Sequence, residues 1–67
     1  MRYAAVIEKT DTGFSAYVLD LPGCIAVGST KRETLSLLRG AVRMHIDGMR
    51  EDGDEVPEPS DVEFVEA

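Results

Sequence analysis

The sequence predicts an α+β fold for a single domain that spans residues 1–67. Three short runs near the N-terminus show the period of two that is typical of strands. They are followed by one long segment whose apolar residues recur at helical spacing, and then by a short alternating run close to the C-terminus. The predicted architecture is a three-stranded antiparallel sheet, one main helix and a short fourth strand, in the order β-β-β-α-β.

The first two strands are expected at residues 2–9 and 14–19, and the third at residues 24–27. Residues 10–13 connect the first pair as a hairpin, in which Gly13 can adopt the positive φ that such turns use. Because the connections between all three strands are short, we expect the strands to form an antiparallel meander.

A turn motif organises the chain between the second and third strands. Pro22 fixes its own φ, and Gly23 permits the reversal of chain direction. Such a turn is common by itself, but its place after a hairpin and before a strand and a helix is more specific. The motif consists of Asp20, Leu21, Pro22, Gly23 and Cys24.

The helix is expected from Thr30 to about residue 52. Thr30 is a favourable N-cap residue, and Glu33 three positions later completes a capping box. Gly53 is a C-terminal stop signal. Gly40 and Gly48 lie inside the helix, where each costs about 1 kcal/mol relative to alanine. Such glycines are usually kept because another element packs closely against them, and a tolerated weakness is the alternative.

The helix carries two apolar stripes. The first, which should cover the sheet, consists of Leu35, Leu38, Val42, Ile46 and Met49. The second, roughly on the far side of the helix, consists of Leu37, Ala41, Met44 and Gly48. A single chain does not need the second stripe, so we expect a partner, a second copy or the returning C-terminal segment to cover it. The alternative is that these are ordinary scattered exposed residues.

The C-terminal part of the chain combines prolines with one short alternating run. Two prolines in residues 52–60 exclude a helix or a central strand there. In residues 61–66, Val62 and Phe64 alternate with Glu63. This pattern predicts a short fourth strand with one solvated face, at an edge of the sheet.

Charge is distributed unevenly along the chain. Residues 1–50 carry seven basic and five acidic side chains, whereas residues 51–67 carry eight acidic side chains and no basic one. The acidic segment would repel a phosphate backbone, which argues against nucleic acid as the main ligand. It could attract a basic protein partner, and the alternative is that it serves solubility alone.

Candidate catalytic groups are few. Cys24 is the only cysteine and His45 the only histidine, but Cys24 lies in an apolar strand, where cysteine is usually an inert hydrophobic residue. Glu8, Asp11 and Asp20 would have to converge on one point to hold Mg²⁺. The two aspartates stand at turn positions that favour Asp for structural reasons. We therefore expect no enzymatic activity, no metal site and no cofactor.

The size of the chain favours association. A domain of 67 residues buries only about 60% of its unfolded surface, and one cysteine cannot form an internal disulfide. We expect a homodimer or a higher oligomer. The N-terminus lacks a signal-peptide pattern, and no apolar run reaches the ~20 residues of a membrane span. We therefore expect a cytoplasmic protein that makes no membrane contact.

The order of the motifs resembles the HicB antitoxin family. The resemblance depends on an Asp-x-Gly hairpin, the Asp-Leu-Pro-Gly-Cys turn, the Gly-Ser-Thr start of the helix and the Val-Pro-x-Pro ending. In this sequence these motifs are Asp11 with Gly13, residues 20–24, residues 28–30 with Glu33, and Asp52-Gly53 with residues 56–59. The resemblance covers nearly the whole chain.

The resemblance implies a partial RNase H-like fold, without implying nuclease activity. It also implies a partner, because members of the family bind and neutralise HicA, a small basic toxin that cleaves mRNA, in type II toxin–antitoxin systems. Many members carry a C-terminal DNA-binding domain, which we do not expect here, and so we expect no direct DNA binding. Two other functions stay open: an orphan oligomeric domain without a toxin partner, and a residual metal-dependent nuclease of RNase H type.

Overall fold

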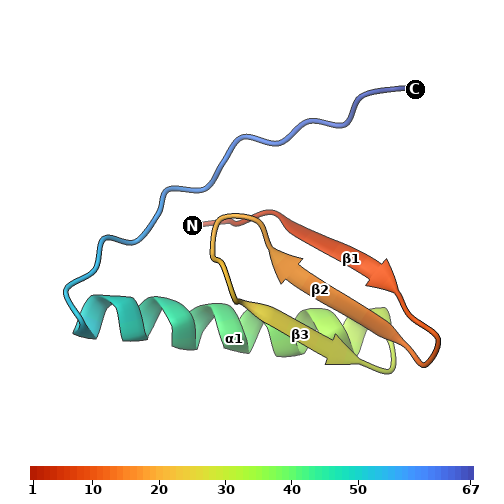
Figure 1. Cartoon of the computed structure of the whole chain (residues 1–67), viewed down its shortest axis with the longest axis horizontal. Helices are drawn as coiled ribbons and strands as arrows, with labels where there is room; N and C mark the ends of the chain where they lie inside the picture. The colour runs from red at the N-terminus through yellow and green to blue at the C-terminus, as the bar shows by residue number, and fades with distance from the viewer.

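The computed structural model describes all of residues 1–67 and arranges them as one sheet covered by one helix. The strands β1 (Ala5–Lys9), β2 (Phe14–Val18) and β3 (Ile25–Gly28) form an antiparallel sheet in the order β1-β2-β3. The helix α1 (Lys31–Glu51) follows β3 and runs along the sheet (Figure 1). The predicted α+β class and the order of these four elements are confirmed.

The register of the sheet decides which side chains face the helix. Ala16 in β2 pairs with Ile7 in β1 and with Ala26 in β3, and directly paired residues lie on the same face. Ala16, Val18 and Ala26 are buried beneath α1. Because two of these three side chains are alanines, the helix can approach the middle of the sheet closely.

The helix buries its first stripe largely as predicted. Leu38 is buried in the core, and Val42, Ile46 and Met49 pack against the core while remaining partly exposed. The buried apolar residues are Ala16, Val18, Leu21, Cys24, Ala26 and Leu38.

The helix covers the sheet only in part. It packs against β2 and β3 but hardly against β1. A single helix is about 10 Å wide, and strands lie about 4.8 Å apart, so one helix spans roughly two strands. The helix-facing side of β1 is therefore left with little cover.

The motif at residues 20–24 forms a tight turn. The backbone N–H of Cys24 donates to the carbonyl oxygen of Leu21 at 3.0 Å, and Gly23 has a φ of 83°. Proline at the second position and a positive φ at the third are the signature of a type II turn. The positive φ predicted for Gly13 is wrong. Gly13 is required because a Cβ at this position would collide with the carbonyl oxygen of Gly28.

The predicted helix ends are confirmed, with one difference at the capping box. The hydroxyl oxygen of Thr30 accepts a hydrogen bond from the backbone N–H of Glu33 at 3.1 Å. The Glu33 carboxylate accepts from the N–H of Ser29 at 2.7 Å, whereas a standard capping box uses the N–H of the N-cap residue itself. Gly53 ends the helix with a φ of 77°.

The fourth strand predicted at residues 61–66 is not formed within the single chain. Two contacts fix the preceding residues at one end of the sheet. The Tyr3 hydroxyl donates to the carbonyl oxygen of Pro57 at 2.6 Å. The backbone N–H and the hydroxyl of Ser60 both donate to the Asp20 carboxylate, at 2.8 and 2.6 Å. We call these contacts the clasp. Beyond the clasp, the C-terminal segment leads away from the sheet and pairs with no strand (Figure 1). The relationship to the RNase H fold stays a prediction.

Two glycine-to-alanine substitutions should change stability in opposite directions. A Cβ at Gly23 or at Gly40 would meet no atom within 4 Å, so only the backbone matters at either position. Gly23→Ala places a Cβ at a positive φ, and should destabilise by about 1–2 kcal/mol. Gly40→Ala, in the helix, should stabilise by about 0.5–1 kcal/mol. Urea unfolding followed by circular dichroism measures both, and shifts of the same sign would contradict the prediction.

Acid should release Ser60 from Asp20, while the hydrogen bond from Tyr3 to Pro57 contains no group that titrates in acid. The Ser60 hydroxyl and then the Ser60 N–H hold the pKa of Asp20 below its ordinary value, because both hydrogen bonds favour the carboxylate. Because the pKa of Asp20 is lower in the folded state, the hydrogen bonds to Ser60 contribute their full stabilisation when the pH is above the ordinary Asp pKa of about 3.9. Their contribution is lost as the pH falls through the lowered pKa.

The change that tests this clasp is Ser60→Ala, which removes the hydroxyl donor. A carboxyl NMR titration should then show the pKa of Asp20 moving up toward its ordinary value. An Asp20 pKa that is the same in both proteins would contradict the clasp.

Candidate partner-binding surface

The second helical stripe lies beside the β3 edge of the sheet, and its predicted place on the far side of the helix is wrong. Ala41 packs against the core, and Gly48 is half-buried. Leu37 and Met44 are 51% and 76% exposed. Residues 57–60 are clasped near Tyr3 and Asp20, so the C-terminal segment does not cover this stripe in the single chain.

An open hollow joins the stripe to the turn motif. It has a volume of about 350 Å³ and is lined by Gly23, Cys24, Ile25, Ala41, Met44 and His45. The turn motif and the second stripe are separate features of the sequence, and the structure brings part of each to one place. The two remaining members of the stripe, Leu37 and Gly48, lie one turn of helix to either side of Ala41 and Met44.

The apolar surface continues from the hollow onto the outer face of the sheet. Ile25 lines the hollow and also pairs with Tyr17 in β2, so both side chains lie on the face away from the helix. Val27 lies on the same face, and all three side chains are exposed. We define the β3–α1 surface as Tyr17, Ile25, Val27, Leu37, Ala41, Met44 and Gly48.

The part of this surface that the sheet contributes was not predicted from the sequence. The signal is the unbroken apolar run Cys24-Ile25-Ala26-Val27, which is typical of a strand covered on both faces. In the single chain only Cys24 and Ala26 of this run are buried, whereas Ile25 and Val27 on the other face are exposed. Contiguous exposed apolar surface of this kind marks sites of protein–protein contact.

Gly48 leaves room on this surface. The expectation that another element packs closely against Gly40 and Gly48 is wrong for the single chain, because a Cβ at either position would meet no atom within 4 Å. Gly40 is exposed, whereas Gly48 belongs to the β3–α1 surface. A partner that approaches this surface can therefore come close to the helix backbone at Gly48.

Cys24 and His45 line the same hollow but form no catalytic pair in this geometry. No hydrogen bond joins them, and Cys24 is 4% exposed. Burial raises the pKa of the Cys24 thiol, so the thiol stays protonated at neutral pH, whereas a nucleophilic cysteine needs its thiolate. Cys24 acts here as a small buried hydrophobic residue.

The carboxylates considered for a metal site are dispersed. No group of three or more His, Cys, Asp or Glu side chains is placed so that it could hold a metal ion. Glu8 and Asp11 are exposed, and Asp20 is engaged by Ser60. The hypothesis of a residual metal-dependent nuclease therefore gains no support from the geometry.

Acidic side chains surround the C-terminal end of α1. Glu51, Asp52, Asp54 and Glu55 are all exposed there, and Arg50 is the only basic residue in the last turn. Negative charge is unfavourable at this end of a helix, because the helix dipole is itself negative there. These carboxylates do not stabilise the helix, and a basic partner would relieve their repulsion.

No helix in the structure is long and apolar enough to cross a membrane.

Comparisons with known proteins agree with the resemblance seen in the sequence. The chain is 38% identical over 63 residues to an uncharacterized 14.9 kDa protein of Haemophilus phage HP1, covering 94% of this chain and 47% of the phage protein. It is 33% identical over 60 residues to a UPF0150 protein of Thermoplasma acidophilum, covering 85% of this chain and 84% of that protein. A UPF0150 protein of Helicobacter pylori is 33% identical over 48 residues, which is 72% of this chain and 67% of the relative.

The chain thus spans about half the length of the phage relative and most of the archaeal one. A family model described as the HicB-like antitoxin of bacterial toxin–antitoxin systems matches residues 3–67, which includes every element of the fold and the clasped C-terminal segment. The chain therefore belongs to the HicB-like antitoxin family.

Proposed function

We propose that this protein is an antitoxin that binds and neutralises a small basic HicA-type toxin, an enzyme that cleaves mRNA. The observation that carries the proposal is the family match over residues 3–67. We further propose that the protein acts by binding and not by catalysis, that it does so in the cytoplasm, and that this domain does not bind DNA directly. The β3–α1 surface is the proposed contact site.

The apolar side chains of this surface supply the affinity in the proposal. The buried centre of a protein–protein interface is depleted in charge and enriched in large side chains such as Tyr and Met. Tyr17, Ile25, Leu37 and Met44 provide such groups in exposed positions. A few well-buried anchors carry most of the binding energy in an interface, and Leu37 and Met44 are the proposed anchors.

The acidic segment supplies orientation and speed of encounter. Residues 51–67 carry eight acidic side chains and no basic one, and those at the helix end follow Gly48 closely along the chain. Complementary charge steers association and selects the right partner more than it adds affinity. A toxin that must bind RNA has a basic surface, so covering that surface would block the toxin's access to its substrate.

The proposal predicts that a small basic toxin is encoded beside this protein, and co-expression of the two proteins is the first experiment. We expect the neighbouring protein to arrest growth when it is expressed alone, and this protein to bind it in a pull-down and restore growth. A neighbour that is not toxic, or that does not bind, would contradict the proposal.

A matched pair of substitutions tests the contact site. Leu37→Glu and Ser36→Glu introduce the same charge at adjacent exposed positions of α1, but only Leu37 belongs to the β3–α1 surface. Leu37→Glu should weaken the toxin complex at least about tenfold, which corresponds to about 1.4 kcal/mol. Ser36→Glu should change the Kd by less than about threefold, because Ser36 lies outside the proposed contact site and its substitution should change the binding energy little.

Isothermal titration calorimetry measures both affinities, and circular dichroism checks that both variants keep their helix. Equal losses of affinity in the two variants would place the contact elsewhere on the protein.

A further inference from the structure

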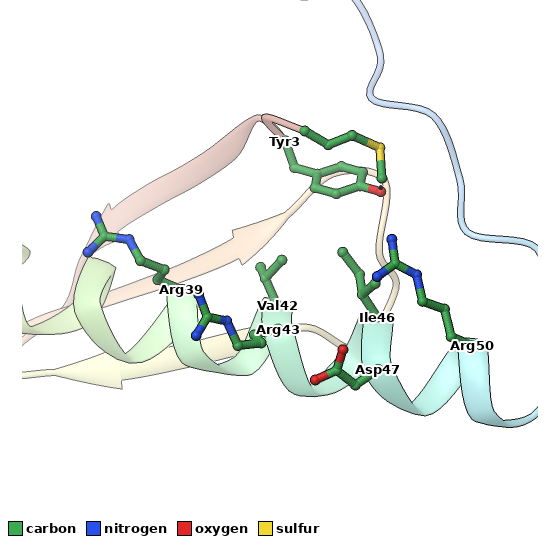
Figure 2. A pocket seen from close by; sticks show the side chains of 8 residues that line it. Tyr3, Arg39, Val42, Arg43, Ile46, Asp47 and Arg50 are labelled. Carbon is green, nitrogen blue, oxygen red and sulfur yellow. Dashed lines mark hydrogen bonds between the residues drawn. The ribbon is translucent and has the colours of Figure 1, made fainter.

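A groove lies on the opposite side of α1 from the β3–α1 surface, between the helix and β1. Two open hollows of about 370 and 380 Å³ adjoin there and share four lining residues, Met1, Tyr3, Arg39 and Val42. Val42 and Ile46 point from the helix toward Tyr3, and arginines stand along the rim (Figure 2). We define the β1–α1 groove as Tyr3, Ala5, Leu35, Arg39, Val42 and Ile46.

The strand beside this groove has a free edge. β1 pairs only with β2, so one row of its backbone N–H and C=O groups has no partner strand. Strand edges of this kind accept a further strand, in which main-chain hydrogen bonds supply affinity and alternate side chains enter neighbouring pockets. The groove and the edge together would accept an extended segment whose apolar side chains lie on one face.

The chain itself carries such a segment, and the apolar side chains of this segment are exposed to solvent. Residues 61–66 include Val62 and Phe64 on one side of the predicted strand and Glu63 between them. Phe64 is 99% exposed, and Val65 is 90% exposed. The clasp at Ser60 and Asp20 directs this segment away from its own sheet, so in the single chain neither the groove nor the aromatic ring is covered.

Charge also matches between the groove and the segment. Arg39, Arg43 and Arg50 line the hollow of about 370 Å³ at this groove, and Asp47 is the one acidic residue beside them. No arginine takes part in a side-chain hydrogen bond within the chain. The segment of residues 61–66 carries three acidic side chains and no basic one. Glu66 shares the face of Val62 and Phe64, so pairing of this strand with β1 would bring its carboxylate to the side of the arginines, whereas Asp61 and Glu63 would face away from the helix.

We propose that residues 61–66 of one chain form a fourth strand on the β1 edge of a second copy, with Phe64 in the β1–α1 groove. The exchange is reciprocal, so that each chain gives one strand and receives one. Exchange of an identical element is a low-cost route to a symmetric dimer, and a chain of 67 residues has little core of its own. The dimer forms whether or not a toxin binds, so this inference and the proposed function can fail separately.

Sedimentation velocity on the full chain tests the exchange. We expect the unaltered protein to be a dimer at micromolar concentration. Phe64→Glu should weaken the dimer at least about tenfold, because it removes the ring and adds a charge beside the groove. Leu37→Glu is the matched control, since it alters another exposed apolar residue on the opposite side of α1, and it should leave the dimer unchanged.

An NMR experiment on a mixed sample separates exchange from pairing within one chain. A dimer made from isotope-labelled and unlabelled protein should show filtered NOEs between the Phe64 ring of one copy and the Val42 or Ile46 methyl groups of the other. A monomeric protein, contacts of Phe64 within its own chain only, or a dimer that survives Phe64→Glu would each overturn the proposal. Toxin binding measured on Phe64→Glu should be retained, which keeps the two claims distinguishable.

Discussion

The packing of one helix on a sheet of three strands sets the main constraint on this molecule. Leu38 of the helix shares the buried core with Ala16 and Ala26, and the helix packs against β2 and β3 while β1 receives little cover. Only 8 of 67 residues are buried, so the fold depends on a few close contacts. One is the meeting of Gly28 with Thr34, where a Cβ on the glycine would come within 3.0 Å of the helix. The same constraint leaves apolar surface on both flanks of α1 and on the outer face of the sheet.

The features that were predicted correctly depend on neighbours in the sequence. The capping residue Thr30, the turn at Gly23 and the strand periodicity are local, so they could be predicted from spacing and residue type. The clasp between Ser60 and Asp20 joins residues 40 positions apart, and no local pattern indicates such a pair. The predicted fourth strand failed in the single chain for a related reason, because alternation indicates that a segment can form a strand but not which edge it meets. Periodicity likewise predicted the second stripe on the far side of α1. In the structure this stripe lies next to β3, and Ile25 of β3 extends its apolar surface.

The two flanks of the helix differ in chemistry, which suggests different occupants. The flank near β3 is apolar and uncharged, with Leu37 and Met44 exposed, and it joins the outer face of the sheet. The flank near β1 combines apolar walls with arginines such as Arg39 and Arg43 (Figure 2). In our proposals the first flank receives the toxin and the second receives the acidic strand of another copy. A member of the HicB-like antitoxin family could in this way bind its partner and complete its own sheet at the same time, because the two surfaces do not overlap.

The most direct test of toxin binding at the β3–α1 surface is an NMR titration of the isotope-labelled protein with the toxin. We expect the largest chemical-shift changes at residues 23–27 and 37–48, with β1 and residues 61–66 nearly unchanged. Changes concentrated on β1 and the C-terminal segment, with residues 37–48 unaffected, would contradict this assignment and would place the toxin on the flank that we give to the second copy.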